Sequence, residues 1–318
     1  MGCAPQSNTS LEQGVCNSDT FELKYKKIDK ETYEYSCTPN LPFIFTDPLT
    51  GDEVYHKIFV RESNDDGKTW SKELDLNFYA SVPEVFLVGE KYNLNVCGTC
   101  LVWDSMDGLN FNPKKFIFTN ITDDDDPCQP RVDPAVDVNN DSVYSIFFKP
   151  NLEETKFEDP ASQTSSHDII GYESTDNGTT FSLDGILISG YTYTDPAIIR
   201  NYNGKDFIYV TSEGNKTLAY SQDISSLLGY QLQNDGNPVI EDLSLADVIR
   251  KPDGDLLMVG TRFSPETKKY KIVGYESSDG LNWSFLRDFF EDGESPSVYY
   301  DLSDKLKIVY VKKELVEE

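Results

Sequence analysis

The chain has 318 residues and a formal net charge of −27, with 55 acidic against 28 basic side chains. Nucleic acids and anionic lipid surfaces bind clusters of Lys and Arg, so this charge excludes both as expected partners. No apolar run is long enough to cross a bilayer, and we therefore expect no membrane span.

The first residues, beginning MGCAPQSNTS, are polar and carry neither a positively charged nor an apolar leader region. They predict a flexible tether over 1–20 and a single folded domain over 21–318. Cys3 resembles the acylated first Cys of a bacterial lipoprotein, so a lipid anchor at Cys3 is one expectation. We expect the chain to be secreted or held at the cell surface, as a monomer.

Six cysteines and only two histidines are present. The cysteines form no paired CxxC motifs, which disfavours a structural zinc site. The scarcity of His leaves little room for Ser-His or Cys-His catalysis, whereas disulfides of an exported protein fit the cysteines better. We predict a bridge from Cys128 to either Cys97 or Cys100, with the connectivity left open.

A short turn motif recurs along the chain. It reads SNDDGKTW from Ser63, SMDGLNF from Ser105, STDNGTTF from Ser174 and SSDGLNW from Ser277, with a fainter SQD at Ser221. The Asp can accept hydrogen bonds from the turn backbone, the Gly can adopt positive φ, and the aromatic residue can anchor the turn. The motif predicts a turn between the third and fourth strands of a repeated unit.

A second motif lies between these turns and predicts a pair of strands joined by a Gly, Asn or Asp turn. Its copies begin at roughly fifty-residue intervals, and their aligned positions are Pro83, Pro134, Pro196, Ala246 and Pro296. A third strand and the Ser-x-Asp turn follow each pair. Four antiparallel strands repeated at this interval are typical of propeller blades.

The predicted fold is therefore all-β, a five-bladed β-propeller of four-stranded antiparallel blades. The turn at Ser63 precedes the first inner pair, and the inner pair at Ser295 has no turn after it. We therefore expect the N- and C-terminal strands to share one blade, with inner strands over 294–312 and outer strands over 54–76, because closure removes exposed sheet edges. A sixth blade over 21–46 is the alternative.

The Ser-x-Asp-x-Gly-x-Thr-Trp turns resemble the Asp-box (BNR) repeats of sialidases and other exported propellers. With the Asp-Pro openings and five repeats, the chain resembles the five-bladed glycosidases of the arabinanase, xylosidase and invertase kind (families 43, 32 and 68). The resemblance implies a central funnel that acts on a glycan through two carboxylates placed before Pro and one Glu placed two residues before Pro. Asp133 and Asp195 match the first two. Ser244 stands where the Glu is expected, and Glu294 matches one blade later.

The resemblance implies that Asp133 is the general base and that Asp195 is the acid that sets the pKa and orients the other groups. It implies Glu294 as the proton donor. Glu213, at the end of a second strand that returns to the same face, is the reserve candidate for the missing acid. The partner would be a carbohydrate bound in the funnel.

Strand periodicity adds candidates for substrate binding. Residues one before and one after the aligned position point to the same side of a strand, which directs Glu84 and Asp247 into the funnel. Arg262 near the end of a second strand could hold two adjacent hydroxyls, because guanidinium forms paired hydrogen bonds. Arg131 is a further candidate.

Four alternatives stay open. The protein could be a non-catalytic surface binding or assembly propeller, which Ser244 favours. It could be a sialidase, although the Arg-Ile-Pro start of that family is absent and its three arginines would have to come from Arg131, Arg200, Arg250 and Arg262. The funnel carboxylates could also hold Ca²⁺, or each Asp could cap backbone N–H groups at the start of a blade.

Overall fold

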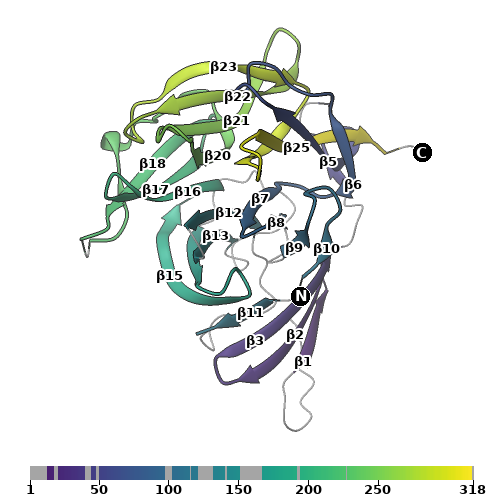
Figure 1. Cartoon of the computed structure of the whole chain (residues 1–318), viewed down its shortest axis with the longest axis vertical. Coiled ribbons are helices and arrows are strands. Elements are labelled where there is room, and N and C mark those ends of the chain that lie inside the picture. The colour runs from purple at the N-terminus through teal and green to yellow at the C-terminus, as the bar shows by residue number, and fades with distance from the viewer. Residues whose placement is uncertain are drawn as a thin grey trace.

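The computed structural model describes residues 13–17, 21–39, 44–47, 50–96, 102–114, 116–120, 132–139, 142–150, 167–191, 194–226 and 228–316. Within these ranges the regular structure is β-strand, apart from one short 3-10 helix, η1 (Asn234–Gly236). None of the described helical structure has the length or apolar character of a membrane span. The sheets are arranged around a common centre (Figure 1), which confirms an all-β propeller.

Four blades are each built from four consecutive antiparallel strands, as the repeats predict. The first contains β7 (Glu84–Val88), β8 (Lys91–Asn95), β9 (Val102–Ser105) and β10 (Asn112–Pro113). The second contains β12 (Val132–Asn139), β13 (Ser142–Pro150), β14 (His167–Ser174) and β15 (Thr180–Tyr191). The third contains β16 (Thr194–Tyr202), β17 (Lys205–Ser212), β18 (Lys216–Asp223) and β19 (Gln231–Leu232). The fourth contains β20 (Ser244–Arg250), β21 (Leu256–Ser264), β22 (Lys269–Ser277) and β23 (Ser284–Glu291). Blades of consecutive strands thus number four in the described chain, where five blades were predicted.

The two ends of the chain meet in a further, composite sheet. Its inner strands are β24 (Glu294–Tyr300) and β25 (Leu306–Leu315), and its outer strands are β5 (Glu53–Ser63), β6 (Leu74–Tyr79) and β4 (Ile44–Thr46). Strand β25 pairs with β5 over ten residue pairs, from Leu306 with Ser63 to Leu315 with Val54. The predicted sharing of one sheet by the two chain ends is therefore present.

The N-terminal strands extend the second blade instead of forming a sixth. Strands β1 (Gln13–Asn17), β2 (Phe21–Asp29) and β3 (Thr32–Pro39) continue through β11 (Phe116–Thr119), which pairs in parallel with β15. Figure 1 shows them along the outer edge of that blade. Strand β1 lies inside the stretch 1–20, for which a tether is predicted, and it pairs with β2 from Gln13 with Lys26 to Asn17 with Glu22.

Large apolar side chains fill the space between neighbouring blades. Fully buried examples are Ile58, Leu94, Tyr172, Phe207, Tyr209 and Tyr310. They come from alternate positions on the strands, because period-two alternation sends every second side chain into one inter-blade layer. Burial between the sheets holds the blades around the centre and fixes where each inner strand begins.

The recurring Ser-x-Asp turns share one hydrogen-bond pattern. In the fourth blade, Ser277 Oγ donates to Asp279 Oδ1 at 3.1 Å, and the Gly280 backbone N–H donates to Ser277 Oγ at 2.9 Å. The turns at Ser63, Ser105 and Ser174 repeat both contacts. Each turn joins the third strand of its sheet to the next strand, as predicted.

Candidate functional site

The first residues of the inner strands surround a small cavity at the centre of the molecule, which we call the central cavity. Strands β7, β12, β16, β20 and β24 contact one another in that order, and β24 contacts β7 to close the ring. The cavity volume is about 20 Å³, which is room for about one water molecule. Its lining consists of Val82, Pro83, Glu84, Asp133, Pro134, Asp195, Pro196, Leu245, Ala246, Asp247, Ser295 and Pro296.

A repeated backbone distortion aims these residues at the cavity. The residue before each aligned position has a left-handed φ of 46° to 50°, and these residues are Val82, Asp133, Asp195, Leu245 and Ser295. Register shifts follow at the same place in four inner strands, for example between Thr194 and Ala197. Such bulges re-aim side chains next to functional sites. A left-handed φ costs a non-glycine residue about 1 kcal/mol or more, so the surrounding ring must hold these residues in place.

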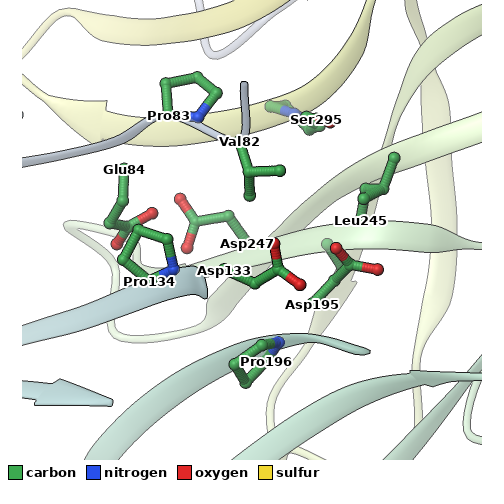
Figure 2. Close-up of a pocket in the computed structure, with 12 residues that line it drawn as sticks. Val82, Pro83, Glu84, Asp133, Pro134, Asp195, Pro196, Leu245, Asp247 and Ser295 are labelled. Carbon is green, nitrogen blue, oxygen red and sulfur yellow. The ribbon is translucent and has the colours of Figure 1, made fainter. Parts of the chain in front are cut away.

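Asp133 and Asp195 form one carboxylate pair in the cavity (Figure 2). Asp133 is 9% exposed. Burial and the neighbouring Asp133 carboxylate raise the pKa of Asp195 well above its ordinary value. The Thr194 hydroxyl donates to Asp195 Oδ2 at 2.7 Å, and the Thr211 side chain also hydrogen-bonds to Asp195. The pair can therefore hold a proton on Asp195 at a pH where an ordinary Asp is ionised.

Glu84 and Asp247 form a second pair, and both join neighbouring sheets. Glu84 Oε1 accepts the Val136 backbone N–H at 3.0 Å, and Asp247 Oδ2 accepts the Val298 backbone N–H at 2.7 Å. The Ser297 hydroxyl lies within hydrogen-bonding reach of both carboxyl groups.

Burial dominates the electrostatics of this second pair. It raises the pKa of Asp247 to about 7, and burial together with Asp247 raises the pKa of Glu84. These two residues line the cavity as predicted, but their hydrogen bonds assign them to inter-sheet contacts.

Glu294 is near the central cavity but is not among its lining residues. It contacts His56 Nε2 at 3.6 Å through Oε1 and Lys313 Nζ at 3.4 Å through Oε2. His56 Nδ1 lies 2.9 Å from Ser81 Oγ, and its ring stacks on Phe45. Burial raises the pKa of Glu294 and lowers that of His56 to about 4.

The structure does not bring two other predicted residues to the cavity. Glu213 follows the end of β17 in an exposed turn. Arg262 packs over the rings of Tyr275 and Phe285, and its Nε donates to the Asp242 carbonyl at 3.3 Å, so it points away from the centre. Arg131 lies outside the described residues.

Several other predictions also fall outside those residues. They include the side chains of Cys3, Cys97, Cys100 and Cys128, and with them the lipid anchor and the predicted disulfide. For Ca²⁺, no group of three or more His, Cys, Asp or Glu side chains arranged to hold a metal occurs in the part of the chain that the structure describes.

Sequence reasoning missed the hydroxyl groups that support the two carboxylate pairs. Ser297 occupies the same repeat position as Glu84 and Asp247, so the alignment of the repeats already marked it as facing inward. Thr194 directly precedes Asp195. Thr211 carries no such signal, because it is brought to Asp195 by the pairing of β16 with β17.

Comparisons with known proteins support the fold only. No family model matches the sequence, and no curated protein matches it. Among solved structures, an endo-arabinase from Bacteroides thetaiotaomicron is similar, with a TM-score of 0.53 and 16% identity over 76% of this chain and 96% of that chain. A bifunctional GH43-CE protein from Bacteroides eggerthii has a TM-score of 0.54 and 11% identity over 75% of this chain and 33% of that chain. The chain therefore shares the β-propeller fold of arabinanase-type glycosidases.

Proposed function

We propose that this protein is glycoside hydrolase-like and acts on a glycan held over the mouth of the central cavity. The observation that carries the proposal is the buried Asp133–Asp195 pair, in which burial and the neighbouring carboxylate raise the pKa of Asp195 well above its ordinary value. Hydrolysis of a glycosidic bond uses two carboxyl groups whose pKa values differ in this way. We count the composite sheet as the fifth blade, which agrees with the five inner strands around the cavity.

The size of the cavity supports a division of roles between the two carboxyl groups. A volume of about 20 Å³ admits about one water molecule but no sugar ring. The glycan therefore lies outside, and the cavity presents a water to it. Asp133 acts as the general base that activates this water, and protonated Asp195 supplies the proton to the leaving oxygen. Glu294 is bound to His56 and Lys313 and is not needed for this scheme.

Substitution of Asp133 tests the proposal. We expect the wild type to release sugar from at least one member of a panel of aryl glycosides and arabinan, xylan and fructan polymers. Asp133→Asn should lower the rate by about 10²–10⁴-fold, the usual contribution of a general base. Asp235→Asn, at an exposed acid in η1, should leave the rate unchanged. Equal rates for wild type and Asp133→Asn would remove the base assignment.

A non-catalytic glycan-binding propeller is the second candidate, and one observation favours it. Ser244 occupies the position of the expected third acid, and it is buried with its hydroxyl directed to the Thr261 carbonyl at 3.4 Å. Affinity electrophoresis on the same polymers separates the two functions. Retardation of wild type and Asp133→Asn alike, without product, would favour binding alone.

We also propose that the protein works outside the cytoplasm, on the grounds of its six cysteines and its acidic composition. Alkylation before and after reduction, read by mass spectrometry, should show fewer than six free thiols in the secreted protein. Six free thiols in that material would contradict disulfide formation.

A further inference from the structure

A larger cavity lies between the second and third blades, at the opposite ends of the inner strands from Asp133 and Asp195. Its volume is about 290 Å³. We call it the inter-blade cavity, and it is lined by Asp137, Asn139, Ser142, Tyr144, Glu173, Arg200, Asn201, Asp206 and Ile224. Strand β12 begins at the central cavity and ends here. Asp133 lines the central cavity and Asp137 lines this one, and the four residue steps along β12 from one to the other span about 13 Å of extended strand.

Arg200 is the basic residue in this lining, and its guanidinium already contacts other side chains of the protein. The Arg200 guanidinium stacks on the Tyr144 ring at 4.1 Å. Its Nη1 lies 3.4 Å from Glu173 Oε1, and its Nε lies 3.6 Å from Asp206 Oδ2. Because both of its polar edges face carboxylates and one of its faces covers an aromatic ring, Arg200 is not available to bind an anion.

The guanidinium of the nearby Arg250 also contacts groups of the protein. Its Nη2 donates to the backbone carbonyls of Arg200 and Asn201, at 3.1 Å and 3.4 Å, and its guanidinium lies over the Tyr202 ring. Tyr144 donates its hydroxyl to Asp184, and Ser142 donates its hydroxyl to Glu173 at 3.3 Å. The guanidinium groups of Arg200 and Arg250 and the hydroxyls of Tyr144 and Ser142 are therefore committed to groups of the protein.

Asp137 differs from the other two acids of the cavity. Its Oδ2 accepts the Arg200 backbone N–H at 3.3 Å. No side chain among the described residues donates a hydrogen bond to Asp137, whereas Asp206 accepts bonds from Asn201 N and Gln222 Nε2. Burial raises the pKa of Asp137 to about 6, against the opposing charges of Arg250 and Arg200 and with Asp206 adding to the rise. Asp137 is only partly exposed, and with one backbone donor its carboxylate has acceptor positions left for a donor supplied from outside.

We propose that the inter-blade cavity binds a small organic cation, a protonated alkyl amine, with its ammonium group on Asp137. The lining carries three carboxylates against the single occupied guanidinium, so it is rich in acceptors and negative in charge. An ammonium group supplies three donors and a positive charge. Ile224, which is 53% exposed, provides an apolar wall for the alkyl chain. The site does not depend on the function proposed for Asp133 and Asp195.

Calorimetric titration of the full chain with putrescine tests the proposal, with butanediol as the neutral analogue. We expect one putrescine to bind per chain at about pH 8 and butanediol not to bind. Asp137→Asn should weaken putrescine binding by about tenfold or more, because a charge-assisted hydrogen bond is lost. Asp235→Asn removes one exposed acid elsewhere and should leave the affinity unchanged. Affinity should fall towards about pH 5, as Asp137 takes up a proton.

Several results would overturn the proposal. They are an absence of putrescine binding, equal binding of butanediol, and equal affinity in wild type and Asp137→Asn. Equal weakening by Asp235→Asn would show only attraction to the acidic surface. Calcium binding that requires Asp137 and excludes putrescine would assign the cavity to a metal ion instead. Thermal unfolding of Asp137→Asn confirms that the variant is folded in each case.

Discussion

A chain that ends before Leu306 is expected not to fold, although it keeps all four blades of consecutive strands. The deletion removes β25, which lies between β24 and β5 in the composite sheet. Five of its apolar side chains are buried, and they are Leu306, Ile308, Val309, Tyr310 and Val311. Each contributes about 1.5 kcal/mol or more, so their loss approaches the whole stability of a typical domain, about 5–15 kcal/mol.

Circular dichroism and thermal unfolding measure this outcome. A control chain that ends at Val316 keeps the whole of β25 and should unfold cooperatively at the temperature of the full-length protein. Val309→Asp, which places a charge in the same sheet at full length, should destabilise strongly. A soluble shortened chain with a β-sheet spectrum and a cooperative transition would show that the ring does not need this closure.

The second large effect is expected from pH, because four acids of the central cavity are crowded together. Burial raises the pKa of Asp247 from 3.8 to about 7, and the pKa of Glu84 is also raised. A raised pKa in the folded state means that folding favours the protonated form. The stabilisation is therefore complete below the unfolded values, near pH 4, and is lost as pH rises through about 7. The shift of Asp247 alone corresponds to a fall in the free energy of unfolding of about 4 kcal/mol between these limits.

The aspartates of the Ser-x-Asp turns have the opposite effect on the pH dependence of stability, and they determine where stability is lost at low pH. Hydrogen bonds from the turn backbone and side chains lower the pKa of Asp65 and Asp279 to about 2. Their contribution is present above the unfolded value and is lost as pH falls towards about 2. Stability should therefore be greatest near about pH 4 to 5, below the usual range for globular proteins.

Glu84→Gln measures how much the carboxyl group of Glu84 contributes to the pH dependence of the free energy of unfolding. The Gln side chain can still accept the Val136 N–H through its carbonyl oxygen, and its amide can donate to Asp247 or Ser297. We expect this variant to be more stable than wild type at about pH 8 and nearly equal at about pH 4, with a flatter pH profile. Glu90→Gln, in the exposed turn of the same hairpin, should leave the profile unchanged. Denaturant unfolding at both pH values gives the comparison, and a wild-type profile that rises with pH would contradict the assignment.

The repeats allowed much of this architecture to be predicted from the sequence. The spacing of the aligned positions located every inner strand, and the unpaired turn at Ser63 indicated that the two chain ends share a sheet. Period-two alternation also placed Glu84, Asp133, Asp195 and Asp247 around one cavity. These predictions succeeded because they depend on local patterns that occur several times in one chain.

The failures come from single positions and from long-range pairing. Glu294 directly precedes the left-handed Ser295, and its carboxylate contacts His56 and Lys313 instead of lining the cavity, which the repeat pattern does not reveal. Arg262 has two aromatic neighbours from β22 and β23, which no pattern near Arg262 reveals. The parallel pairing of β11 with β15 joins segments far apart in the chain and has no signature in either.

The five residues with a left-handed φ around the central cavity allow different side chains at equivalent positions. Each occupies the same backbone conformation at the start of its inner strand, yet the side chains are a Val, two Asp, a Leu and a Ser. The backbone thus accommodates apolar, acidic and hydroxyl side chains at equivalent positions of the inner strands. Replacing one of these side chains therefore changes the chemistry of the cavity lining at a single position, while the backbone of the ring can keep its conformation.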